Sequence, residues 1–122
     1  MRKEYRFGKG RPNRYAAKLR GSPTGWFRNR RGKAIGLSEW ARLREDLAYI
    51  RVAIEKLPFG RRISTVWIGL DMSFGLGRAA TFETAVFSRS GKVLDMCKYD
   101  NEADAVQGHR KMVTLWKRKV KR

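Results

Sequence analysis

The sequence offers little for disulfide or metal chemistry. Its 122 residues include one cysteine, Cys97, and one histidine, His109. A single thiol excludes an internal disulfide, and no second cysteine or histidine stands at the spacing of a zinc site. We therefore predict no metal and no cofactor. We expect Cys97 to be a small core residue of a strand and His109 to be a packed helix residue, because no serine or cysteine nucleophile is placed to use its imidazole.

Long apolar runs are missing as well. No run in the sequence reaches the length of about 18 residues that crosses a membrane. The charged beginning, M-R-K-E-Y-R-F-G-K-G, is not followed by the apolar segment of a secretory signal. We expect no membrane partner and a cytoplasmic location in a bacterium or a host cell, with association with a virion as the alternative.

Acidic residues are scarce and unevenly placed. Lysine and arginine number 29 against 11 aspartates and glutamates, a net charge of +18. Residues 1–36 hold 12 basic groups and one acid, residues 37–108 hold ten of each, and residues 109–122 hold seven basic groups and no acid. This predicts a basic arm, a neutral core and the basic end of a last helix. Because such an excess of positive charge opposes compaction unless a polyanion is near, the expected partner is nucleic acid.

The arm over 1–36 has no sustained hydrophobic period, and six glycines and two prolines interrupt it. We expect it to become ordered only on binding. Its aromatic residues are candidates for stacking on bases, or alternatively for packing on the core: Tyr5, Phe7, Tyr15, Trp26 and Phe27. Phosphate contacts are expected from the basic residues of both cationic segments: Arg2, Lys3, Arg6, Lys9, Arg11, Arg14, Lys18, Arg20, Arg28, Arg30, Arg31, Lys33, Arg110, Lys111, Lys117, Arg118, Lys119, Lys121 and Arg122.

The first regular element is predicted after Leu37. Ser38 is a candidate N-cap, and apolar residues follow it at helical spacing. From Ile50 onward the apolar residues fit two structures, a continuation of the same long helix or an alternating strand. We favour a helix over 38–48 and then a strand over 49–56, because β-branched residues are dense there and a P-F-G-R-R turn follows.

Further strands are predicted over 63–70, 81–88 and 93–99, with a hairpin turn at Ser90-Gly91. Asp100 is expected to cap a closing amphipathic helix. The sum is an α+β fold: a small antiparallel sheet of three to four strands with a leading helix, a C-terminal amphipathic helix and the extended basic arm. Core positions are expected at the tryptophans of the elements and along one stripe of the last helix: Trp40, Trp67, Val106, His109, Val113, Trp116 and Val120.

Two carboxylates, Asp71 near the end of one predicted strand and Glu83 at the start of the next, could bind a divalent metal or share acid and base work. The segment V-W-I-G-L-D-M-S, followed by T-A-V-F-S-R-S-G-K-V-L-D, is similar to the opening of RNase H-like nucleases of the Holliday-junction resolvase type. That fold needs further strands and acids, whereas one basic helix follows here. Gly75 and Gly77 precede a strand instead of the helix N-terminus that a phosphate loop requires. We therefore predict no catalytic residue, and keep Asp71 and Glu83 as the fallback pair.

The segments I-S-T-V-W-I-G-L-D-M-S-F-G and F-E-T-A-V-F resemble a family of small uncharacterised proteins of phages and mobile elements, with the pattern V-S-T-V-W-L-G-L-D-H-S-F-G and F-E-T-M-V-F. Met72 stands where that pattern has histidine. The stretch E-Y-R-F-G-K-G-R-P-N-R-Y-A-A-K-L is similar to a short N-terminal motif of some antitoxins. The resemblance implies a mobile-element or defence context and no established activity.

These observations predict a non-enzymatic basic accessory protein that binds RNA or DNA through its cationic arms. The binding is expected to be largely independent of sequence and to occur within a larger nucleoprotein complex that includes a protein partner. Three alternatives stay open. They are an inhibitor of a nucleic-acid-guided defence complex, a virion protein that contacts the packaged genome, and the RNase H-like metal-dependent nuclease.

Overall fold

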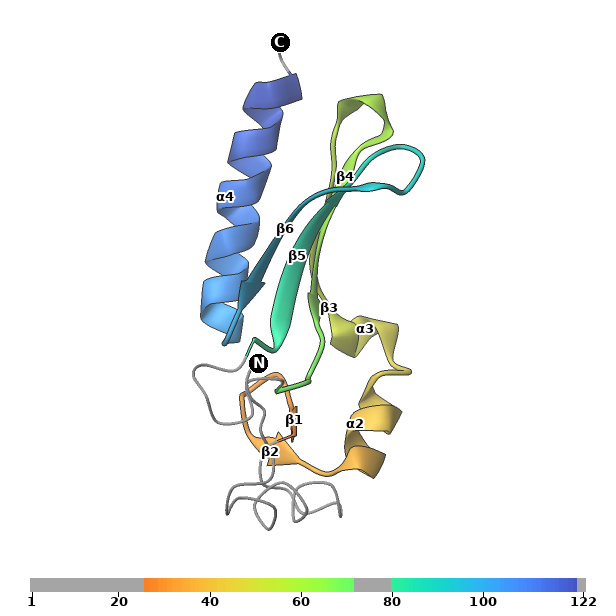
Figure 1. The fold of residues 1–122 in the computed structure, drawn as a ribbon, viewed down its shortest axis with the longest axis vertical. Coiled ribbons are helices and arrows are strands. Elements are labelled where there is room, and N and C mark those ends of the chain that lie inside the picture. Colours follow the sequence, from red (N-terminus) through yellow and green to blue (C-terminus); the bar gives the residue numbers. More distant parts are fainter. Residues whose placement is uncertain (1–25, 72–79, 121–122) are drawn as a thin grey trace, which may run out of the picture.

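The computed structural model describes residues 26–71 and 80–120. Four strands form an antiparallel sheet in the order β3-β4-β5-β6, and a separate two-stranded sheet pairs β1 with β2 (Figure 1). The predicted α+β class is confirmed. The elements in chain order are β1 (Phe27–Arg28), β2 (Ala34–Ile35), α2 (Leu37–Leu43), α3 (Leu47–Ile50), β3 (Arg51–Lys56), a 3-10 turn (Pro58–Gly60), β4 (Arg62–Trp67), β5 (Phe82–Phe87), β6 (Val93–Tyr99) and α4 (Glu102–Val120).

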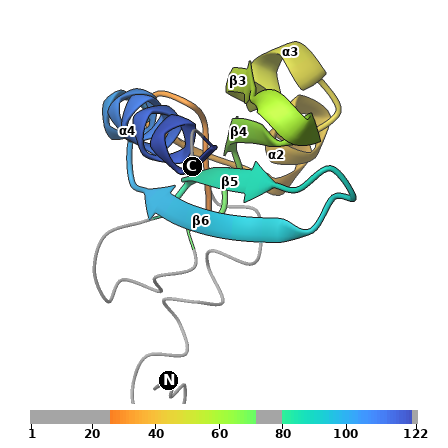
Figure 2. The ribbon, with the colours of Figure 1, turned by 90° about the horizontal axis from the view of Figure 1, so that it is seen from above.

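The four-stranded sheet is a simple meander, in which each strand pairs with its neighbour in sequence. The β3–β4 turn and the β5–β6 turn therefore lie at the same end of the sheet. Helix α4 follows β6 and runs back along it, so the end of α4 reaches that same end (Figure 1). Helices α2 and α3 and the β1–β2 pair lie toward the other end. Figure 2, a view from above, shows α4 to the left of the strands and α2 and α3 to their right, with α3 next to β3.

The core lies between the sheet and α4, and toward the start of α4 it also includes residues of β2 and α3. Along β4, Ile63, Thr65 and Trp67 are fully buried and alternate with partly exposed residues, as the period of two in a strand requires. The buried residues form two clusters. One contains Ile35, Ile50, Trp67, Phe82 and Ala105, and the other contains Leu57, Ile63, Val86, Met112 and Trp116.

The leading helix differs from the prediction of a helix over 38–48 and a strand over 49–56. Helix α2 ends at Leu43, and a second short helix occupies Leu47–Ile50 before β3 begins. The side chain of Asp46 explains the break, since it accepts hydrogen bonds from the backbone N–H groups of Ala48 and Tyr49 and so caps a new helix. The alternative of one long helix is wrong for the same reason. Ser38 is not the cap either, because Gly36 precedes α2 without a side-chain cap.

Three further predictions need correction. The strand predicted over 63–70 ends at Trp67, because Gly69 has a positive φ of 77° that a strand cannot contain. Asn101, not Asp100, caps α4: its Oδ1 accepts a hydrogen bond of 2.8 Å from the N–H of Asp104. Cys97 is exposed and not a core residue. The turn at Ser90-Gly91 is confirmed, with Gly91 at φ 93°.

The stripe of α4 that packs on the sheet is also slightly displaced. Ala105, His109, Met112 and Trp116 are its buried residues, and the predicted Val106 and Val113 lie at the margins. Trp40 is partly buried and packs on Phe27 with 5.0 Å between the ring centroids. The side chain of Val120 lies outside the described residues.

Candidate nucleic-acid interface

Basic side chains gather at the end of the molecule where the two turns and the end of α4 meet. We call this set the basic pole. All its members except Arg61 are exposed. Its residues are Lys56, Arg61 and Arg62 around the β3–β4 turn, Arg89 and Lys92 in the β5–β6 turn, and Lys117, Arg118 and Lys119 at the end of α4. Figure 1 shows that the two turns and the end of α4, which are distant in sequence, lie at the same, upper end of the molecule. The basic residues of these three elements are therefore brought to one end of the fold.

Contacts hold these three elements together. The two turns touch, because a Cβ placed on Gly60 would lie 2.7 Å from Cγ of Arg89. The guanidinium carbon of Arg61 lies 5.5 Å from the ring centroid of Trp116, and Nζ of Lys119 lies 4.5 Å from the same centroid. These cation–π contacts fix two charges on a buried indole. The pole is thus built on packed structure.

The charges of the described residues are separated along the molecule. Two acids lie close to the basic pole: Glu55, which is 3.9 Å from Nζ of Lys117, and Asp95, whose Oδ2 accepts a hydrogen bond from Nε1 of Trp116. Most other carboxylates lie toward the opposite end, on α2, before α3 and around the start of α4: Glu39, Glu45, Asp46, Asp71, Asp100, Glu102 and Asp104. Acids at the start of α4 and cations at its end also suit the helix dipole.

The exposed side of α4 extends the cationic surface. Arg110, Lys111 and Arg118 line a shallow hollow of about 290 Å³ together with Thr114 and Leu115. None of these three cations forms an ion pair with a carboxylate in the described part of the chain. Arg110 and Arg118 are eight residues apart, which is about 12 Å along a helix, a distance that spans several phosphates of one strand.

The basic residues expected from segment 1–36 fall into two groups where the structure describes them. Arg28 and Arg30 are used inside the fold. Nε and Nη2 of Arg28 donate to Oδ2 of Asp71 at 3.2 and 3.1 Å, and Arg30 forms a two-pronged ion pair with Glu102. That ion pair raises the pKa of Arg30 above its ordinary value. By contrast, Arg31 and Lys33 are exposed in the β1–β2 turn.

Two of the aromatic residues that were candidates for base stacking, Trp26 and Phe27, lie in the described part of the chain, and both contact the rest of the fold. Phe27 packs on Trp40 and its strand pairs with β2, which is the core-packing alternative. Trp26 is half-buried, and its backbone oxygen accepts from the N–H of Asp71. The remaining expected residues lie outside the described residues: Arg2, Lys3, Tyr5, Arg6, Phe7, Lys9, Arg11, Arg14, Tyr15, Lys18, Arg20, Lys121 and Arg122.

Asp71 and Glu83, the fallback catalytic pair, occupy positions within the packed fold. Asp71 is 7% exposed and bound by Arg28, while Glu83 lies on β5 opposite Val66 of β4 and is partly exposed. Within residues 26–71 and 80–120, no three His, Cys, Asp or Glu side chains are grouped so that they could hold a metal ion. Met72, Gly75 and Gly77 lie outside the described residues.

His109 takes part in a buried polar chain. Its Nδ1 lies 2.7 Å from Oγ1 of Thr65, which in turn lies 2.5 Å from Oγ1 of Thr84. His109 is 7% exposed, and both threonines are fully buried. The predicted packed histidine is therefore confirmed, with a specific partner on the sheet. Burial lowers the pKa of His109 below its ordinary value, against a small opposing effect of Glu55.

This arrangement predicts a loss of stability in mild acid. The folded protein holds His109 neutral, whereas the unfolded chain takes up a proton near pH 6.5. The stabilisation is therefore complete above pH 6.5 and is lost below it, by up to about 1.4 kcal/mol per pH unit until the folded pKa is reached. We expect urea unfolding at pH 7.5 and 5.5 to show a larger loss for the wild type than for His109→Asn, whose amide can bond Thr65 without titrating. Equal losses would contradict the assignment.

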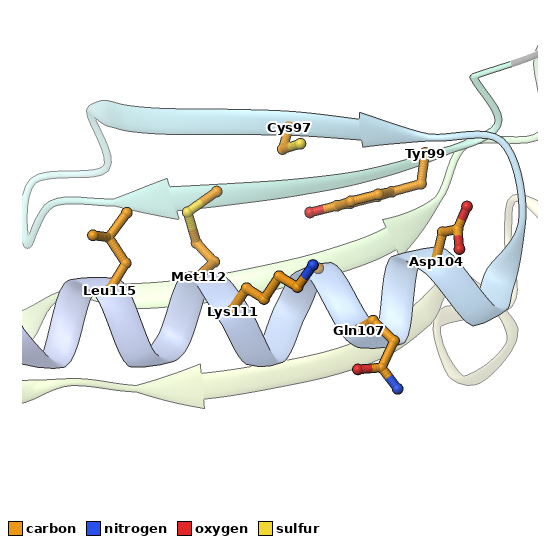
Figure 3. A pocket seen from close by; sticks show the side chains of 8 residues that line it. Cys97, Tyr99, Asp104, Gln107, Lys111, Met112 and Leu115 are labelled. Atoms are coloured by element: carbon orange, nitrogen blue, oxygen red, sulfur yellow. The ribbon is translucent and has the colours of Figure 1, made fainter.

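A second hollow, of about 420 Å³, lies between β6 and α4 (Figure 3). Tyr99 and Cys97 line it from the strand, and Met112 and Leu115 from the helix. Its polar groups, on Asp104, Gln107 and Lys111, come from the same helix. The ring of Tyr99 lies directly on the helix backbone at Gly108, where an added Cβ would overlap it. The hollow thus marks where α4 leaves the edge strand partly uncovered.

Comparisons with known proteins add no assignment: no family model, no curated protein and no solved structure matches the chain significantly. The resemblance to the phage and mobile-element family stays a prediction. Among the helices that the structure describes, none is long and apolar enough to cross a membrane.

Proposed function

We propose that this chain binds RNA or DNA without catalysis, and that the basic pole is its main contact surface with the phosphate backbone. The observation that carries the proposal is the clustering of eight basic side chains from three separate elements at one end of the fold, where Glu55 and Asp95 are the only nearby acids among residues 26–71 and 80–120. Self-repulsion opposes such a concentration of positive charge, and a polyanion relieves it.

The chemistry of the pole fits phosphate more than base edges. Its arginines and lysines come from turns and a helix end instead of one recognition helix that could enter a groove. Binding through such charges is largely independent of sequence and releases counterions, so it weakens steeply with salt. The exposed Arg110 and Lys111 on α4, and Arg31 and Lys33 in the β1–β2 turn, supply further contacts. A larger nucleoprotein complex of a mobile element is the setting we propose.

Salt titration of binding tests the proposal. In the variant Arg89→Gln, Lys92→Gln, Arg118→Gln, three exposed cations are lost that make no ion pair with a carboxylate in the described residues. Loss of three phosphate contacts should reduce the slope of log K against log salt by about 2 for a single strand. At 0.15 M salt the affinity should fall by more than tenfold. Fluorescence anisotropy with a labelled oligonucleotide measures both quantities.

The matched control removes the same charge away from the pole. Arg42, Arg51 and Lys98 are exposed on α2, at the start of β3 and near the end of β6. Their triple replacement by glutamine should leave the slope close to that of the wild type. If both triple variants lose the same slope, net charge and not the pole governs binding. If the pole variant keeps the full slope, the contacts lie elsewhere in the chain.

A further inference from the structure

Phe59 occupies an unusual position at the tip of the β3–β4 turn. It is 75% exposed, the largest exposure among the large apolar residues of the described chain. Its backbone is in the left-handed region, with φ 64° and ψ 27°. A bulky residue rarely takes this conformation, which costs about 1–2 kcal/mol relative to a residue with an ordinary φ. Asparagine or glycine would fit the turn with less strain.

The turn itself does not require an aromatic ring. Pro58 sets the first position of the turn, Gly60 takes a positive φ of 75°, and the N–H of Leu57 bonds the carbonyl of Arg61 across it at 2.8 Å. The neighbouring Leu57 supplies the buried contact, being 6% exposed. A phenylalanine at this position therefore adds backbone strain and exposed apolar surface, and its ring, 75% exposed, has no packing role. Strain of this kind is found where function requires the side chain.

The surroundings of Phe59 indicate what the ring would meet. Lys56, Arg61 and Arg62 flank it in sequence, and Arg89 packs against the adjacent Gly60. An exposed ring among cations is the arrangement by which proteins hold single-stranded nucleic acid, since the cations follow the phosphates and the ring stacks on a base. Bases inside a duplex already stack on one another and are not available in this way.

We propose that Phe59 stacks on an unpaired base, so that the basic pole prefers single-stranded RNA or DNA, or unpaired regions of a folded strand, to a duplex. This inference rests on the proposed function and adds the substrate class to it. The pole supplies affinity for phosphate in either form. The ring supplies the preference for unpaired bases and tolerates any sequence, because every base offers a flat face.

The variant Phe59→Asn separates the ring from the fold. Asparagine tolerates the left-handed backbone, so the protein should fold with unchanged or slightly higher stability. Affinity for a single-stranded 20-mer should fall about tenfold, whereas affinity for a duplex of the same length should change less than twofold. Phe59→Leu, which keeps apolar bulk but has no aromatic face, should show the same selective loss. Neither change alters the charge of the pole.

Three results would overturn the inference. The first is a Phe59→Asn variant that binds single strands as tightly as the wild type. The second is an equal loss of affinity for single strands and duplex. The third is binding to vesicles of anionic phospholipid that depends on Phe59 while single-strand binding does not, which would assign the ring to a membrane surface. The pole variant of the previous section keeps Phe59, so failure here leaves the test of phosphate binding intact.

A cross-link locates the contact directly. An oligonucleotide that carries 5-iodouracil couples on irradiation to an aromatic ring stacked on it. Trypsin cuts after Lys56 and Arg61, and Phe59 is the only aromatic residue of the intervening peptide Leu57–Arg61. Mass spectrometry should find the nucleotide on this peptide. A cross-link confined to other peptides would contradict stacking on Phe59.

Discussion

Replacing Gly69 by alanine is expected to lower the free energy of unfolding by about 3 kcal/mol or more. Two effects add here. The positive φ of 77° disfavours any side chain by about 1–2 kcal/mol. The new methyl group would also overlap Cζ2 of Trp67 and lie 2.8 Å from Cδ1 of Trp40. Trp67 is fully buried and bonded through Nε1 to the carbonyl of Arg28, so it cannot give way cheaply.

Gly91 provides the matched control for this experiment. It has a comparable φ of 93°, but an added Cβ there meets no atom within 4 Å. Gly91→Ala should therefore show the backbone effect alone, about 1 kcal/mol. Urea unfolding of both variants measures the difference, which reports the clash with Trp67 and Trp40. If the two variants lose equal stability, the packing around Gly69 is looser than the structure shows.

The same glycine shows what sequence patterns could and could not predict about the fold. The strand of β6 and the turn at Ser90-Gly91 follow from local alternation and local turn chemistry, and both were predicted. The end of β4 depends on Gly69, where the chain turns so that Phe27 pairs with Leu70. An apolar run gives no sign of such a turn, because I-S-T-V-W-I-G-L keeps its hydrophobicity past the last strand residue. Likewise, the Asp46 side chain ends the leading helix by capping a second one through hydrogen bonds to backbone N–H groups. The spacing of apolar residues gives no indication of such a cap.

The basic pole was missed because charge was counted by segment. Residues 37–108 sum to zero, yet Arg61, Arg62, Arg89 and Lys92 lie at one end while the acids lie mostly at the other. The signal was present in the predicted elements. In a meander the first and third turns share an end, and a helix that returns along the last strand finishes there. P-F-G-R-R, S-R-S-G-K and the basic end of α4 could therefore have been placed together from topology alone.

The roles of Arg28 and Arg30 could not be predicted in this way. R-N-R-R-G-K reads as a uniform cationic stretch, but Arg28 and Arg30 meet acids 43 and 72 residues away. Such partners are fixed by the tertiary fold. Arg31 and Lys33 are instead exposed in the β1–β2 turn. The distinction matters for tests of the proposed nucleic-acid binding, because changes at Arg28 would act through loss of folded protein and not through loss of a phosphate contact.

Replacing Asp71 by alanine is expected to lower the free energy of unfolding by about 3 kcal/mol, because it leaves the partly buried guanidinium of Arg28 without its carboxylate. Asp71→Asn should lose less, since its amide oxygen still accepts from Nε and Nη2. In an Arg28→Met background, Asp71→Ala should cost clearly less than in the wild type, and the four unfolding curves give the coupling. Nucleic-acid affinity of folded Asp71→Asn protein should equal that of the wild type.

The RNase H-like alternative requires the opposite result, namely metal-dependent cleavage that Asp71→Asn abolishes while the free energy of unfolding is nearly unchanged. A coupling energy near zero between Asp71 and Arg28, combined with such cleavage, would show that Asp71 is a catalytic residue and not a structural one.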